Sequence, residues 1–264
     1  MIKMRYKITI EYDGTNYCGW QKQNGKFSIQ ESIEKSIQLM THEVVEVYGC
    51  GRTDAGVHAI AITAHFDLEK DIETHKLISG INYYLKNQYI SRLEKIYYDK
   101  KDFIQDISII DCEKVDNDFH SRFSAKMRYY KYIILNRQQP TALYSKRVWQ
   151  VFKKLNFDAM NDCLQYLIGK KDWSSFRDSD CQANTAIKTI SGVSLIKDND
   201  KIIFTINAKS FLHHMVRNIV GTLVEVGLEK ISVEDFKSII EAKDRKKAGP
   251  TAPPQGLYFV KVDY

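Results

Sequence analysis

Long apolar runs are absent from this sequence. The longest, such as residues 60–64, fall far short of the roughly 20 residues that a membrane-spanning helix needs. The charged residues at the start of the chain are followed by no apolar stretch of the kind that a secretory signal carries. We therefore expect a soluble cytoplasmic protein with no membrane partner.

Glycine, proline and cysteine are all scarce. The 13 glycines and 4 prolines are too few for a linker-rich or collagen-like chain. The 5 cysteines are odd in number, and no two form a Cys-x-x-Cys pair. A disulfide framework or a zinc knuckle is therefore not expected, and the cysteines read as reduced, buried side chains.

Charge is unevenly distributed along the chain. The formal net charge of +6 divides into −2 for residues 1–112 and +8 for residues 113–264. A basic half suits a polyanion such as nucleic acid, although a solvated basic surface would give the same excess.

Strand and helix patterns alternate along both halves of the chain. Residues 6–12 alternate apolar and polar side chains, which predicts a strand with one buried face. A Ser-x-x-Glu box at residues 28–31 opens a helical stripe. The remaining segments with strand or helix patterns are residues 44–50, 58–66, 77–85, 106–112, 127–135, 157–168, 187–196, 201–208, 215–226, 232–240 and 256–262.

This order predicts an α+β fold. We expect two related α/β subdomains, residues 1–112 and 113–264, each with helices flanking a mainly antiparallel sheet, and an active-site cleft between them. Residues 86–105 are charged and weakly patterned, so they read as an insertion or a short extra helix.

A glycine-rich segment, residues 49–58, carries the first candidate site. It places one cation, Arg52, and one carboxylate, Asp54, among three glycines that allow close backbone approach. An aspartate in such a loop caps a turn in many proteins. The functional alternative is a positioned carboxylate nucleophile.

Basic and aromatic residues interleave over residues 119–132. Arg122, Lys126 and Arg128 lie among tyrosines and phenylalanines, a pattern that suits RNA, because cations hold phosphates while rings stack on bases. On a strand, Tyr130 would share a face with Tyr132. A tyrosine-rich core strand with a charged outer face explains the same pattern equally well.

A third segment, residues 211–221, reads as a buried helix that contains Arg217. A buried arginine needs a carboxylate partner, and we expect Asp54 to be that partner. The adjacent His213 and His214 would diverge on a helix, which is poor geometry for one metal ion. They read better as hydrogen-bonded or RNA-facing histidines.

These segments together resemble the bacterial tRNA pseudouridine synthase A family. The Gly-Arg-Thr-Asp-Ala-Gly-Val-His motif at residues 51–58 is highly specific to that family, and the resemblance runs nearly from end to end. One departure is Lys86, which follows Leu85 where the family often has proline. The other is the 86–105 segment. Further matching motifs lie at residues 11–14, 19–21, 119–125, 175–177, 213–221, 242–245, 249–253 and 256–258.

The resemblance implies an isomerase that converts uridine to pseudouridine at positions 38, 39 and 40, in the anticodon stem-loop of tRNA. It implies no cofactor and no metal, and a homodimer. Asp54 corresponds to the family's nucleophile and Arg52 to a residue that helps displace the base. Tyr130 corresponds to a tyrosine that stacks on the uracil and assists proton transfer, and Arg217 to the arginine that pairs with the nucleophile. Further RNA contacts are expected at Arg122, Lys126, Arg128 and His213.

Two other classes compete with this interpretation. A non-catalytic tRNA-binding protein or RNA chaperone could use the same fold, although the joint presence of Asp54, Tyr130 and Arg217 argues against it. A nucleotide-hydrolysing enzyme would need the Lys and Ser/Thr of a phosphate-binding glycine loop, and the 49–58 segment lacks that pattern.

Overall fold

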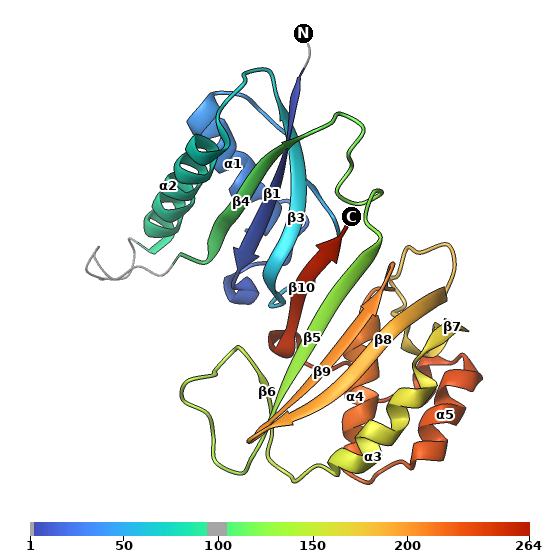
Figure 1. Cartoon of the computed structure of the whole chain (residues 1–264). Coiled ribbons are helices and arrows are strands. Elements are labelled where there is room, and N and C mark those ends of the chain that lie inside the picture. The colour runs from blue at the N-terminus through green and yellow to red at the C-terminus, as the bar shows by residue number, and fades with distance from the viewer. Residues whose placement is uncertain (1–2, 94–104) are drawn as a thin grey trace. The chain divides into compact units, whose positions relative to one another are not determined.

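The computed structural model describes residues 3–93 and 105–264, and Figure 1 shows their elements. The chain divides into two compact units. Unit 1 comprises Met1–Ala125 and Phe259–Tyr264, and unit 2 comprises Lys126–Tyr258. The division lies further along the chain than the expected 112/113, and the last residues return to the first unit.

Unit 1 is built on antiparallel strands. Strand β1 (Met4–Tyr12) lies between β4 (Ile107–Val115) and β3 (His58–Leu68), and β10 (Leu257–Asp263) follows β3 in the sheet order. Both neighbours pair with β1 in antiparallel register. The apolar side chains that alternate along β1 are buried, which confirms the strand predicted from that alternation.

Two helices accompany this sheet. Helix α1 (Ile29–Thr41) begins at Ser28, whose hydroxyl oxygen accepts a hydrogen bond from the Glu31 amide at 3.2 Å. The helix start predicted at residues 28–31 is thus confirmed. Helix α2 (Thr74–Leu93) packs against α1 and β4, as Figure 1 shows.

Two expectations for unit 1 need comment. The strand predicted at residues 44–50 is wrong, because only β2 (Tyr48–Gly49) pairs, with β3, and Val44 is 83% exposed. The segment expected as an insertion begins inside α2, which continues to Leu93. Residues 94–104 of that segment lie outside the described residues.

Unit 2 has its own strands. Their order is β5 (Met127–Asn136), β9 (Lys201–Ala208), β8 (Ile187–Asp198) and β7 (Gly169–Asp172), with antiparallel pairing throughout. The short strand β6 (Trp149–Val151) pairs with β5 in parallel. Neither β6 nor β7 carries a pattern that predicts it.

Three helices pack on one another in unit 2 (Figure 1). Helix α3 (Phe157–Asp162) is shorter than the predicted 157–168, because a tighter 3₁₀ turn replaces the α-helix at Cys163. Helix α4 (Met215–Gly227) is buried almost all round and ends at the predicted glycine. Helix α5 (Val233–Ala242) begins with a complete capping box.

The α+β class is confirmed, since the strands are mostly antiparallel and helices pack beside them in both units. Among the described residues, none of the helices combines the length and apolar character needed to cross a membrane.

Candidate active site

Asp54 lies in the loop between β2 and β3, and its backbone is held by a segment from the start of the chain. Gly19 and Asp54 pair as an antiparallel bridge. Beside the bridge, the Trp20 amide donates to the carbonyl of Thr53 at 3.0 Å. A turn closes the loop, with the Val57 amide donating to the Asp54 carbonyl at 3.2 Å. The backbone of Asp54 is therefore fixed before any substrate arrives, which is a requirement for a preorganised reactive group.

Glycines make this close approach possible. A side-chain carbon at Gly19 would lie 2.4 Å from the Thr53 carbonyl oxygen, and Gly19 has a left-handed φ of 105°. A side-chain carbon at Gly14 would lie 1.9 Å from the Val57 carbonyl oxygen. Both positions therefore admit only glycine unless the loop moves.

Buried polar contacts hold the loop beside Asp54 and at its end. Next to Asp54, the hydroxyls of Tyr12 and Thr53 lie 2.7 Å apart in the core. Where the loop enters β3, Nδ1 of the buried His58 lies 3.1 Å from Oδ1 of Asp13. Burial alone would raise the pKa of Asp13, but hydrogen bonds with His58 and Thr15 outweigh it and hold that pKa well below its usual range. The sequence reasoning missed the role of His58, although it lies within the 51–58 motif.

The two cationic side chains of unit 1 that were predicted as site residues, Arg52 and Arg122, are exposed. Arg52 lies in the same loop as Asp54 and is exposed. Arg122 is exposed beside Phe123, with its guanidinium carbon 5.7 Å from the ring centroid. Both side chains are therefore accessible to a negatively charged partner.

Unit 2 presents Tyr130 from β5. Tyr130, Tyr132 and Arg128 alternate on the buried face of the strand, as the period of two predicts. The Tyr130 ring meets the Phe211 ring edge to face, with centroids 5.1 Å apart. An edge-to-face contact of this kind fixes the plane in which the Tyr130 ring lies.

Arg217 lies in the first turn of α4 and is anchored to the segment that precedes β10. Its Nε donates to the Ala252 carbonyl at 2.7 Å, and the Ala252 amide donates to the Arg217 carbonyl at 3.1 Å. The Tyr132 hydroxyl donates to the neighbouring Pro253 carbonyl at 2.6 Å. Burial raises the pKa of Tyr132 well above its ordinary value, against the opposing effect of the Arg217 charge. Arg217 is thus a half-buried charged group that the backbone of Ala252 holds in place.

Lys126 and Arg128, two predicted RNA contacts of unit 2, differ in burial. Lys126 is exposed at the start of β5. Arg128 is buried, and its guanidinium donates to the Lys209 carbonyl just after β9. Arg128 therefore has a hydrogen-bond partner within unit 2, whereas the charged side chain of Lys126 is accessible to solvent.

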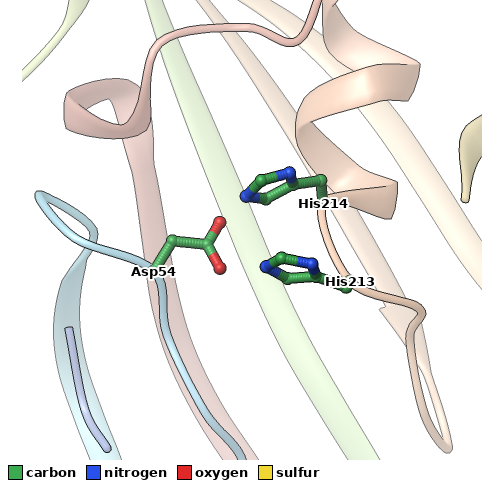
Figure 2. Close-up of side chains that lie close together, drawn as sticks. All are labelled: Asp54, His213 and His214. Carbon is green, nitrogen blue, oxygen red and sulfur yellow. The ribbon is translucent and has the colours of Figure 1, made fainter. Parts of the chain in front are cut away.

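His213 and His214 do not diverge, and that expectation is wrong. Both residues precede α4, and His214 adopts a left-handed backbone with φ of 58°. Their rings stack with centroids 3.9 Å apart (Figure 2). Nδ1 of His214 lies 2.7 Å from Oδ2 of Asp178, a partner that the sequence reasoning missed.

Comparison with known proteins defines the class. A family model described as tRNA pseudouridine synthase matches residues 8–96 and 163–264. These ranges contain the Asp54 loop, the His213–His214 pair and Arg217. The chain therefore belongs to the tRNA pseudouridine synthase family, and it is accordingly an isomerase.

Two relatives that are similar to this chain carry the same name within that family. A tRNA pseudouridine synthase A from Wolbachia pipientis wMel is 47% identical over 262 residues, which cover 99% of this chain and 100% of the relative. A tRNA pseudouridine synthase A from Maricaulis maris (strain MCS10) is 43% identical over 260 residues, 98% of each chain. Both similarities extend over nearly the full length of this chain.

Proposed function

We propose that this protein isomerises uridine to pseudouridine at positions 38, 39 and 40 in the anticodon stem-loop of tRNA, with Asp54 as the nucleophile. The observation that carries the proposal is the Gly19–Asp54 bridge, which fixes the only carboxylate of the 51–58 motif in a glycine-lined loop. The family membership supplies the reaction class.

The reaction breaks the bond between N1 of uracil and the ribose carbon C1′, and it forms a bond between C5 and the same carbon. A base in a stem must leave the stack before this can happen, at a cost of a few kcal/mol. Arg52, two residues from Asp54 and exposed, is the proposed group that helps displace the base. Its fixed positive charge suits an RNA backbone or a carbonyl oxygen.

Unit 2 supplies the remaining groups of the proposal. Tyr130 stacks on the uracil, a role supported by the defined orientation that Phe211 gives its ring. Arg217 pairs with Asp54 and keeps the carboxylate ionised. The proposed pairing is supported by the half-buried setting of Arg217 in the first turn of α4, since a charge partly withdrawn from water favours a compensating charge nearby.

The proposed partner is tRNA, bound by a cytoplasmic homodimer. Arg122, Lys126 and His213 are the proposed phosphate or base contacts, because each is at least partly exposed. Arg128 is left out of these proposed contacts, because its buried guanidinium already donates to the Lys209 carbonyl.

A direct assay tests this function. Unmodified tRNA with uridine at positions 38–40 is incubated with the purified protein, and pseudouridine is then detected by carbodiimide labelling and primer extension. We expect label at those positions, none in a matched transcript carrying cytidine there, and no change in RNA mass. Tight tRNA binding without label would instead favour the non-catalytic tRNA-binding protein. Label at other uridines would still show a pseudouridine synthase, but it would contradict the proposed positions 38, 39 and 40.

A further inference from the structure

The proposed reaction requires a proton acceptor besides the nucleophile. When C5 of uracil joins C1′, C5 still carries its hydrogen and is tetrahedral. That proton must leave C5, its bonding electrons must restore the double bond between C5 and C6, and N1 must gain a proton. A positioned base speeds a step of this kind by about 10²- to 10⁴-fold.

Asp178 and His214 form a carboxylate–imidazole pair in unit 2. Nδ1 of His214 lies 2.7 Å from Oδ2 of Asp178. The Asp180 amide donates to Oδ1 of the same carboxylate at 3.1 Å. Burial would raise the pKa of Asp178, but these two hydrogen bonds and the histidine charges outweigh it and lower that pKa. The carboxylate therefore stays ionised and accepts the Nδ1 proton of His214, which places the acceptor lone pair of the neutral ring on Nε2.

The loop that carries Asp178 is tied down on both sides. Nη2 of Arg177 donates to the carbonyls of Cys181 and Ala183 at 2.8 and 2.9 Å. The His213 amide donates to Sγ of Cys181 at 3.4 Å, and the Asp178 amide donates to the His213 carbonyl at 3.3 Å. The carboxylate and the imidazole are thus held as one rigid arrangement, which a catalytic pair requires.

The position of His214 links it to the residues of the proposed site. His214 caps the N-terminus of α4, three residues before Arg217, and Phe211, three residues earlier, contacts Tyr130. The left-handed backbone of His214 is costly for a residue other than glycine, and such conformations gather at functional sites.

We propose that His214 is a catalytic residue whose Nε2 accepts the proton leaving C5, and that Asp178 is the positioning residue that holds it. The imidazolium so formed, or solvent in exchange with it, returns a proton to N1, so that no atom is gained or lost. This inference rests on the proposed function and adds to it the identity of the base.

The first test replaces His214 by glycine, which adopts a left-handed φ without strain. With tRNA deuterated at C5 of uridine, we expect kcat to fall at least about 100-fold while KM stays within about threefold. We also expect a primary isotope effect that wild type lacks, and partial restoration of turnover by added imidazole. A folded His214→Gly variant with neither the isotope effect nor the rescue would overturn the proposal.

The second test addresses the positioning residue, and it decides the question if His214→Gly does not fold. Asp178→Asn should lower kcat by about 10- to 100-fold and reveal the isotope effect, since the amide no longer fixes the tautomer. Asp162→Asn removes an equal charge from an exposed side chain elsewhere in unit 2 and should stay within about twofold of wild type. A loss confined to tRNA affinity in Asp178→Asn would instead identify an RNA-binding pair. If wild type forms no pseudouridine, the proposed function itself fails, a result distinct from both.

Discussion

Gly19 and Asp54 pair across an antiparallel bridge, although they lie on opposite sides of helix α1 in the sequence. The pairing depends on two properties of residue 19, its left-handed φ and its lack of a side chain. The loop that presents Asp54 therefore takes its position from a glycine outside the loop.

Gly19→Ala should displace the Asp54 loop. The new methyl group would lie 2.4 Å from the Thr53 carbonyl oxygen, so backbone must shift. We expect unfolding in urea to show a loss of about 2 kcal/mol or more, and turnover to fall more than about tenfold. Gly25→Ala is the matched control, because Gly25 also has a left-handed φ of 71° but open space around it. That control should lose about 1 kcal/mol and keep its turnover. Equal turnover in the Gly19→Ala and Gly25→Ala variants would mean that activity does not depend on the Gly19–Asp54 bridge.

Arg122 and Lys126 should account for part of the salt dependence of tRNA binding. Each phosphate contact contributes a slope of about −0.9 on duplex and about −0.7 on single strands in a log–log salt plot. The Arg122→Gln, Lys126→Gln variant should weaken binding and flatten the slope by between one and two such contributions. Lys76→Gln with Lys237→Gln removes the same charge from exposed helix positions and should leave the slope unchanged. An unchanged slope in the first variant would place the tRNA path elsewhere.

Arg128 should behave differently from those two cations. Its guanidinium bonds to the Lys209 carbonyl and is buried, so Arg128→Gln removes a charged hydrogen bond within unit 2. We expect a loss of about 1.5–3 kcal/mol in the free energy of unfolding, measured by urea denaturation. A variant of wild-type stability that binds tRNA more weakly would instead return Arg128 to the RNA contacts.

His65 should make unit 1 less stable in mild acid. Burial lowers the pKa of His65 to about 4, and the charges of His120 and Arg5 act in the same direction. The unfolded chain takes up a proton near the ordinary value of 6.5, whereas the folded chain does not until about 4. Stability should therefore fall as pH drops from about 6.5 towards 4, and this contribution should change no further below that.

The variant His65→Asn tests this directly, since its amide oxygen can replace Nδ1 as acceptor for the Ser121 amide. Urea denaturation at pH 7 and pH 5 should show a smaller loss of stability in the variant than in wild type. Equal losses in the two proteins would mean that other groups carry the acid sensitivity.

Several parts of the fold could be predicted from the sequence because they depend on local patterns. The alternation in β1, the serine cap of α1 and the glycine at the end of α4 each act over a few residues. The glycine loop is local in the same way, but its composition alone fits a turn-capping aspartate equally well, and the nucleophile role of Asp54 came from the family resemblance of the 51–58 motif.

The parts that could not be predicted depend on distant partners. Strand β7 (Gly169–Asp172) exists because β8 pairs with it, and its own residues show no strand pattern. Asp178 is separated in sequence from His214, and neither residue type indicates the other. The stacking of His213 on His214 follows from a single left-handed residue, which no helical spacing could indicate.

The most direct test of the central claim is the activity of Asp54→Asn on unmodified tRNA, measured by carbodiimide labelling alongside a tRNA binding assay. Asparagine keeps the size of the side chain but is no nucleophile. The account predicts no detectable pseudouridine in a folded variant, with tRNA affinity within about tenfold of wild type because phosphate contacts dominate binding. Turnover near the wild-type rate would contradict it and remove Asp54 from the chemistry.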